Sequence, residues 1–373
     1  MSTVAVPSPP PTASEDAESL RKALQGNAQL LAARPWILFP LLFFFLVSSF
    51  FRFCIAIATD AASATSPCVS VDAGWRADKA ALVGILCRRT AAQRAAIRRA
   101  YAFLYREPLL NCFRYKLSRH YCLLSVDFWK ALILWTMDPA ERDANLVHEA
   151  VKKKDENYIL VLIEVSCAST PDHLLAVRKI YLKLFSCSIE EDVASSPALR
   201  EPLKKMLVSL VSSYRYAGEH VDMDVAKLEA AQLSEAIREK QLHGNEVVRI
   251  ISTRSKSQLR ATFQQYKEDQ GRDIAEDINS RCSSQFGRML KSAVWCLTSP
   301  EKHFAQVIRY SILGVGTYED LLTRVIVSRA EIDMKRIKEE YMARYKSAVT
   351  LDVAGDTSFG YRDMLLALVG SED

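Results

Sequence analysis

The side chains best able to catalyse reactions or bind metal are scattered along this chain. It has nine cysteines but no C-x-x-C pair, and its six histidines show no metal-ligand spacing. It contains no phosphate-binding P-loop and no G-x-S-x-G nucleophile motif. These absences argue against a zinc ribbon, a disulfide framework and the common hydrolases. We therefore expect a protein that is not an enzyme and that resides in a reducing compartment inside the cell.

Charge and composition narrow the class of protein further. The 373 residues carry a formal net charge of +5, 49% of them are hydrophobic, and only 12 are glycine. These values fit a globular, helix-leaning protein and exclude disordered and fibrous classes. A mild positive excess can favour anionic surfaces, but a dedicated nucleic-acid binder carries more. We expect no nucleic-acid partner.

A repeated frame after residue 75 indicates which elements must position any site. Four windows each place a tyrosine twelve residues after their first residue; they run from Arg89 to Tyr101, Ser169 to Tyr181, Arg254 to Tyr266 and Arg329 to Tyr341. In the fourth window apolar residues recur at three- and four-residue steps, which is typical of a helix. We find no sustained alternating strand pattern. The sequence therefore predicts an all-α protein of four repeats, each of about five helices.

The first 74 residues stand apart from this frame. Residues 1–13 are rich in proline and serine and predict a flexible tail, after which Ser14-Glu15-Asp16 open a helix that ends at Gly26. Residues 36–58 are apolar except for Arg52, and as a helix they would span about 34 Å, enough to cross a bilayer. Three interpretations of this region stand: a membrane anchor, a buried or membrane-grazing loop, and an insertion foreign to the fold, such as a translated intron.

Several stretches of the chain resemble annexins of the plant type. They are SEDAESLRKALQG, ILWTMDPAERDA, LVSLVSSYRY, ISTRSKSQL, CLTSPEKHF, TRVIVSRAEIDMKRIKEEY and DMLLALVG. The resemblance covers residues 14–26 and nearly everything from 75 to 373. Removing residues 27–74 joins ALQG to WRADKAALVGIL, which is similar to the unbroken first repeat of the family. The resemblance therefore favours the foreign insertion, whereas the length of the apolar run alone would favour the anchor.

The resemblance implies four five-helix repeats in one curved disc that binds calcium and lipid on its convex face. The repeats would span 14–145 (interrupted by 27–74), 146–218, 219–303 and 304–373. It also implies a cytoplasmic protein that associates peripherally with the plasma membrane or endomembranes, in calcium or stress signalling or in membrane trafficking. The protein would be integral to the membrane only if residues 36–58 were a true anchor.

In this family a Gly-x-Gly-Thr loop between the first two helices of a repeat binds calcium. The stretch from Gly314 to Glu319 (GVGTYE) resembles that loop. Calcium takes six to eight oxygen ligands, and glycines let successive carbonyls turn toward one point. Thr317, with Asp320 three residues on, resembles a helix-capping pair. The candidate calcium residues that the resemblance implies are Ile312, Gly314, Gly316, Thr317, Glu319, Asp356 and Asp363.

The acid that would close this site is less regular. The family's DTSGDYEKML resembles Asp356–Met364, which puts Arg362 at the acidic position, with Asp363 one residue away and Asp356 as the other nearby acid. A guanidinium would repel calcium, so we expect weak binding of Ca²⁺, in repeat 4 only. The alternative is a glycine-rich turn that only joins two helices.

The other three loops lack the pattern. The first would have Arg76 for its second glycine and Trp129 at its closing position, and the second has three lysines where the glycines would stand. The third reads QLHGN at 241–245. By resemblance the lipid-facing candidates are Trp75, Arg76, Lys152, Lys153 and Lys154. Exposed cations attract anionic phospholipid, and indole is favoured in the headgroup region. The alternatives are an ordinary solvated charge run and a partly buried tryptophan, and a calcium-independent lipid- or partner-binding scaffold is our second functional hypothesis.

Three further resemblances are weaker. Cys167 and Cys296 resemble two family cysteines discussed as a redox cluster, but Ile163 stands where the family has a methionine, and buried, inert thiols are the alternative. Arg88 stands where the family has a histidine invoked for peroxidase activity. Residues 248–250 (VRI) resemble a proposed actin-binding tripeptide, which is a weak indication of actin as a partner.

Overall fold

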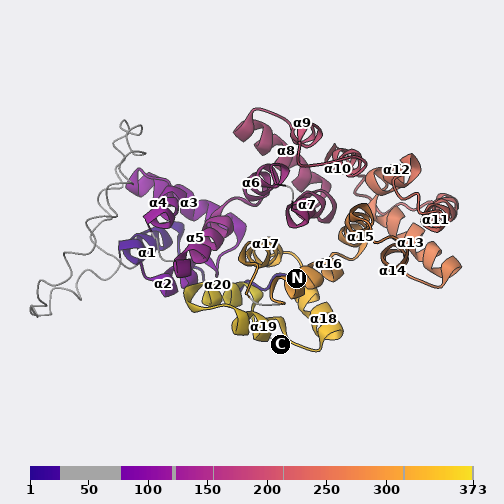
Figure 1. Cartoon of the computed structure of the whole chain (residues 1–373). Helices are drawn as coiled ribbons and strands as arrows, with labels where there is room; N and C mark the ends of the chain where they lie inside the picture. Colours follow the sequence, from indigo (N-terminus) through magenta and orange to yellow (C-terminus); the bar gives the residue numbers. More distant parts are fainter. Residues whose placement is uncertain (26–76, 120–122, 154, 213, 314–315, 372–373) are drawn as a thin grey trace, which may run out of the picture. The chain divides into compact units, whose positions relative to one another are not determined.

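The protein is helical throughout the part of the chain that the structure describes. A computed structural model describes all residues except 26–76, 120–122, 154, 213, 314–315 and 372–373. Outside those gaps it contains twenty α-helices, one π-helical turn and no strand (Figure 1). The prediction of an all-α protein is confirmed.

The helices fall into four groups of five. The first repeat has α1 (Ala13–Gln25), α2 (Lys79–Leu86), α3 (Ala91–Tyr105), α4 (Leu109–Arg119) and α5 (Leu123–Thr136). The second has α6 (Pro139–Val151), α7 (Glu156–Ile163) with the π-helical η4 (Glu164–Ala168), α8 (Pro171–Phe185), α9 (Ile189–Ser195) and α10 (Leu203–Ser212). The third has α11 (Met223–Arg238), α12 (Asn245–Thr253), α13 (Lys256–Gln270), α14 (Ile274–Arg281) and α15 (Gln285–Thr298). The fourth has α16 (Pro300–Ser311), α17 (Glu319–Arg329), α18 (Met334–Tyr345), α19 (Val349–Asp356) and α20 (Phe359–Val369).

These bounds move two of the expected repeat borders. Residue 145 lies inside α6 and residue 303 lies inside α16, so the helices divide the chain at 138/139 and 299/300 instead. In both places a proline is the first helical residue, where its missing N–H costs nothing. The border at 218/219 falls in the connection between α10 and α11.

The repeated tyrosine occupies one equivalent place in all four repeats. Its side chain is at most 1% exposed in each, and its hydroxyl contacts the side chain eleven residues further on. The pairs are Tyr101 with Cys112, Tyr181 with Asp192, Tyr266 with Asp277 and Tyr341 with Asp352. The tyrosine frame read from the sequence therefore describes a real structural repeat.

The end of the third helix is equally regular. In every repeat the residue five positions after the tyrosine has a positive φ: 52° at Arg106, 58° at Ser186, 69° at Gly271 and 57° at Lys346. A left-handed residue directly after a helix is a common way to end it. Only the third repeat uses glycine, so the other three hold a side chain in an unfavourable conformation.

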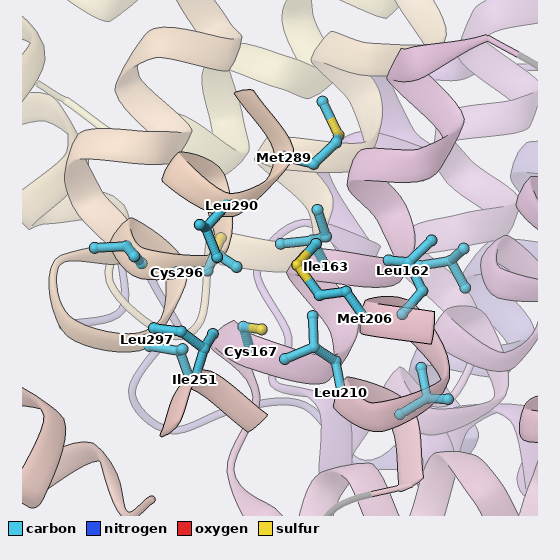
Figure 2. Packing of buried hydrophobic residues seen from close by; sticks show 14 of the residues in the cluster. Leu162, Ile163, Cys167, Met206, Leu210, Ile251, Met289, Leu290, Cys296 and Leu297 are labelled. Atoms are coloured by element: carbon cyan, nitrogen blue, oxygen red, sulfur yellow. The ribbon is translucent and has the colours of Figure 1, made fainter. Parts of the chain in front are cut away.

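The chain forms two compact units, and the border between them lies inside the first repeat. One unit is residues 6–120, in which α1 packs against α2 and α3. The other contains residues 1–5 and 121–373, in which α5 packs against α17 and α20, and α15 packs against α7 and η4. An apolar cluster of this second unit joins repeats 2 and 3 and includes Leu162, Met206 and Leu290 (Figure 2).

The N-terminal residues are attached, contrary to the expected flexible tail. The backbone N–H of Thr3 donates to the carbonyl of Ala330 at 2.9 Å, and its hydroxyl donates to the carbonyl of Leu368 at 2.5 Å. Both carbonyls lie at helix C-termini, where intrahelical donors run out. Thr3 supplies those donors. The composition of residues 1–13 does not predict these long-range hydrogen bonds.

All of the apolar insertion, 27–74, lies outside the described residues, which resume at Ala77 after Gln25. The N–H of Asp78 donates to the carbonyl of Ala23 at 2.9 Å, so the chain before the gap and the chain after it meet. In the described part of the chain no helix is long and apolar enough to cross a membrane. The run 36–58 falls outside that part, and the three interpretations of it stay predictions.

Candidate functional site: the loop between α16 and α17

The loop at 312–318 is closed at its base. It leaves α16 after Ser311, whose side chain is fully buried and donates to the carbonyl of Ile308 at 2.7 Å. The N–H of Tyr318 returns to the carbonyl of Ser311 at 2.8 Å. The rings of Tyr310 and Tyr318 stack with centroids 5.5 Å apart and planes 5° apart. The two ends of the loop are therefore held together, while Gly314 and Val315 lie outside the described residues.

Gly316 gives the loop a backbone conformation that other residues avoid. Its φ is +97°, and no heavy atom lies within 4 Å of where a Cβ would stand. Space is therefore available for a side chain, and the backbone angle alone requires glycine.

Thr317 connects the loop to an acid on another helix. Its hydroxyl oxygen lies 2.6 Å from Oδ2 and 2.9 Å from the main-chain oxygen of Asp356, the last residue of α19. Asp356 is thus the candidate acid that the structure brings to the loop. Arg362 Nε lies 3.7 Å from Asp363 Oδ1, and both side chains are exposed.

The expected capping pair at the start of α17 is wrong. The hydroxyl of Thr317 donates a hydrogen bond to Asp356, and the residue directly before α17 is Tyr318. Asp320 accepts a hydrogen bond from Lys130 of α5 at 3.1 Å instead. Glu319 is the first residue of α17, and its carbonyl accepts a hydrogen bond from the hydroxyl of Tyr361 at 3.1 Å.

The donor set at this loop fits a hard cation such as calcium. The carbonyls of Ile312 and Gly316 and the carboxylate of Asp356 are all oxygen donors, the kind that calcium prefers. Among the described residues no three His, Cys, Asp or Glu side chains gather closely enough to hold a metal ion. Main-chain oxygens and one carboxylate would therefore hold the ion, and a softer metal would find no matching ligands here.

The second-repeat loop is cationic, as the sequence indicates. Lys152 and Lys153 are exposed, and Lys154 lies outside the described residues. Lys152 Nζ lies 2.6 Å from Nε2 of His148. Lys153 Nζ donates to the hydroxyl of Tyr158 at 2.7 Å and lies 4.0 Å from the centroid of that ring. The side chain of Asp155 accepts a hydrogen bond from the N–H of Asn157 and caps α7. The exposed charges of Lys152 and Lys153 are positive and would repel a calcium ion.

The remaining candidates lie away from these loops or outside the described residues. Trp75 and Arg76 fall in the segment that the structure does not describe. Trp129, at the closing position of the first loop, is completely buried in α5. In the actin-like tripeptide Val248 and Ile250 are buried, and Arg249 pairs with Glu229 and Glu246.

Cys167 and Cys296 are both completely buried in the apolar cluster (Figure 2). Ile163 lies in the same cluster with its side chain fully buried. Burial raises the pKa of both thiols, which lowers the population of reactive thiolate. Nothing in this arrangement favours redox chemistry over packing.

Comparisons with known proteins give consistent results. The family model described as annexin matches residues 228–293 and 303–368. Annexin D3 of Arabidopsis thaliana is 43% identical over 305 residues, which cover 80% of this chain and 92% of that protein. Annexin-like protein RJ4 of Fragaria ananassa is 43% identical over 300 residues, with the same two shares. The solved structure of annexin III has a TM-score of 0.77 at 24% identity and covers 100% of this chain and 98% of its own.

Proposed function

Because the chain belongs to the annexin family and resembles its plant members, we propose that it binds anionic phospholipid membranes weakly, in a calcium-dependent manner, through its fourth repeat. Annexins as a family bind calcium and anionic phospholipid. The observation that carries the proposal is the hydrogen bond from Thr317 to Asp356, since it brings a carboxylate to the glycine loop from 39 residues away. Without it the loop would offer main-chain oxygens alone.

The loop residues have separate tasks in this proposal. The carbonyls of Ile312 and Gly316 would supply neutral oxygens, and Asp356 would supply the negative charge that sets calcium affinity. The carbonyl of Gly314, the first glycine of the Gly-x-Gly-Thr motif, would be a further calcium ligand. A bound calcium ion would neutralise Asp356 and offer its remaining positions to lipid phosphate. With one carboxylate we expect an apparent calcium affinity of about 10⁻⁴ M or weaker.

The cellular role follows from the same family membership. We propose a non-enzymatic, peripheral protein of the cytoplasm that associates with the plasma membrane or endomembranes, in calcium or stress signalling or in trafficking. The sparse chemical motifs support the absence of an enzymatic activity. Actin is a weaker proposal. In the tripeptide that resembles an actin site, Val248 and Ile250 are buried and Arg249 already forms ion pairs within the protein.

Calcium titration against phosphatidylserine vesicles tests the fourth-repeat site. Asp356→Asn keeps an acceptor for the Thr317 hydroxyl but removes the charge, and we expect the calcium midpoint to rise about tenfold or more. Gly316→Arg denies the positive φ and should abolish calcium-dependent binding. Asp363→Asn is the matched control, since it removes an exposed acid of α20 and should shift the midpoint less than twofold.

A calcium-independent scaffold is the second candidate, favoured by the exposed Lys152 and Lys153. If wild type sediments with vesicles equally well in chelator, and neither Asp356→Asn nor Gly316→Arg changes this, the calcium proposal is overturned. Lys152→Glu combined with Lys153→Glu should then abolish binding, because each cation near an anionic leaflet contributes about 1 kcal/mol.

A further inference from the structure

The turn that leads into α20 holds an aromatic residue in an unfavourable conformation. Phe359, the first residue of α20, has a φ of +52°, and its side chain is 62% exposed. A bulky residue with positive φ is an outlier, and such outliers concentrate at functional sites. Burial does not compensate for the strain, because most of the ring faces solvent. Gly360, which could adopt this conformation freely, follows immediately.

Contacts on both sides of Phe359 fix the turn to the fourth-repeat loop. Three residues before it, Asp356 accepts the hydrogen bond from Thr317. Two residues after it, the hydroxyl of Tyr361 donates to the carbonyl of Glu319 and lies 2.7 Å from the hydroxyl of Thr323. Tyr361 is itself only 5% exposed. These hydrogen bonds hold the residues on both sides of Phe359 to the loop and to α17.

The loop itself carries two more exposed apolar side chains. Leu313 is 52% exposed and Tyr318 is 51% exposed, on either side of Gly316. We call Leu313, Tyr318 and Phe359 together the apolar rim. Tryptophan and tyrosine are favoured at the boundary between lipid and water, and phenylalanine and leucine are common on the buried face of helices that lie in that boundary. The apolar rim and the acid Asp356 occupy the same two connected turns.

We propose that Phe359 is a membrane anchor that enters the headgroup region of an anionic bilayer when calcium joins the adjacent loop to lipid phosphate. The inference rests on the proposed function, since calcium must bring the loop to the bilayer. In the free protein Phe359 is 62% exposed to solvent. Binding to lipid then buries an apolar surface that folding leaves exposed.

Stability and lipid affinity should respond in opposite directions at this position. Phe359→Gly relieves the positive φ, so we expect the thermal midpoint to rise by about 1–2 °C. The same change removes the ring and should weaken binding to phosphatidylserine vesicles at saturating calcium by about five- to tenfold. Phe359→Ala should weaken binding equally but keep the strain, and so give no comparable rise in midpoint. A residue with only a structural role would not gain stability while losing affinity.

Phe103→Ala is the matched control, because Phe103 is an aromatic residue of α3 that is 72% exposed. It should leave vesicle affinity within twofold. A Phe359→Trp variant gives a direct readout: relative to wild type, its added fluorescence should shift to the blue with vesicles and calcium together, and brominated lipid should quench it.

The outcomes separate the inference from the proposed function. If wild type does not bind vesicles in calcium, the proposed function and the anchor both fall. If wild type binds, while Phe359→Gly binds equally well and brominated lipid leaves the Phe359→Trp signal unchanged, the anchor alone is wrong. Affinity loss in Phe359→Gly together with lipid quenching supports it.

Discussion

The hydroxyl of Tyr101 lies 3.5 Å from Sγ of Cys112, at the position where the other three repeats present an aspartate. The first repeat has another acid near this place. Arg21 contacts the Tyr101 hydroxyl at 3.2 Å and the carboxylate of Glu107 at 3.4 Å. In the first repeat the acid beside the tyrosine and arginine is therefore Glu107, six residues after Tyr101. In the other repeats the aspartate stands eleven residues after the tyrosine.

The fourth repeat shows the ordinary arrangement. There Arg309 donates to Asp352 at 2.9 Å, Tyr341 donates to the same carboxylate at 2.6 Å, and Ser347 stands at the position that Glu107 has in the first repeat. Each repeat of this pair thus has one carboxylate beside its tyrosine and arginine, contributed from a different position.

Restoring the aspartate in the first repeat should therefore destabilise the protein. Cys112→Asp adds a second carboxylate beside Glu107, in a place where Cys112 is 3% and Glu107 6% exposed. We expect a loss of about 2 kcal/mol in the free energy of unfolding, because two buried like charges repel. Adding Glu107→Ser should recover at least half of it. Denaturant unfolding of both single variants and the double variant measures this, and simple additivity would contradict the exchange of acids.

The left-handed residues after the third helices predict a pair of opposite effects. Lys346 has a φ of 57°, so Lys346→Gly should stabilise the protein by about 0.5–1 kcal/mol by removing a strained Cβ. Gly271 has a φ of 69° and no heavy atom within 4 Å of a Cβ, so Gly271→Ala should cost about as much without any clash. Thermal unfolding compares the two. Shifts of the same sign would show that something other than the backbone angle decides at these positions.

Lys256 predicts an unusual rise of stability in alkali. Burial, with repulsion from Arg215 and Arg329, lowers its pKa from 10.5 to about 8, although its ammonium donates to the carbonyl of Ser169 at 3.0 Å. Between pH 8 and 10.5 the unfolded chain binds more protons at this lysine than the folded protein, so the free energy of unfolding increases with pH. We expect this group to contribute about 2 kcal/mol between pH 8 and 10.

The measurement needs a difference, because other groups titrate nearby. Burial raises the pKa of Tyr181 and Tyr266, and these groups lower stability as the pH passes their unfolded value near 10. Lys256→Met keeps the length and apolar character of the side chain without the charge. The wild type should gain stability relative to this variant from pH 8 to 10; a constant difference would mean that Lys256 stays charged in the folded protein.

Arg362→Glu should have little effect on calcium binding. Arg362 lies on α20, six residues after Asp356 in the sequence, and its side chain is 44% exposed. Exposed charges are strongly screened, so we expect the calcium midpoint to fall by less than about threefold. Titration at low and at physiological salt measures the change. A tenfold gain would mean that position 362, and not Asp356, supplies the closing acid.

The helical frame was predictable from the sequence because it repeats. A tyrosine buried four times leaves the same spacing four times, and the apolar steps around Tyr341 reveal its helix without any partner. The site was less predictable, since its contacts join residues far apart in the chain. Whether Thr317 caps its own helix or bonds Asp356 depends on where α19 ends in space. The attachment of Thr3 to Leu368 is of the same kind: a helix C-terminus needs a donor, and nothing local indicates which residue provides it.

The segment 27–74 leads to the last prediction. Because the N–H of Asp78 bonds the carbonyl of Ala23, the flanking helices α1 and α2 already form a closed hairpin. In the other repeats the first two helices are joined by 152–155, 239–244 and 312–318, which are four, six and seven residues. Deleting 27–74 would leave Gly26 and residues 75–78, five residues, within that range.

We therefore expect the deletion variant to fold with an equal or higher thermal midpoint, measured by circular dichroism. A longer loop costs more closure entropy, so removing it should stabilise slightly if it contributes no core. Asp78→Ala provides the control. The Asp78 side chain accepts from the N–H of Ala81 at 3.0 Å at the start of α2, and losing this cap should cost about 1 kcal/mol in both the full and the shortened chain. A loss of several kcal/mol on deletion, or a cap that matters in only one background, would mean that residues 27–74 are an integral part of the first repeat.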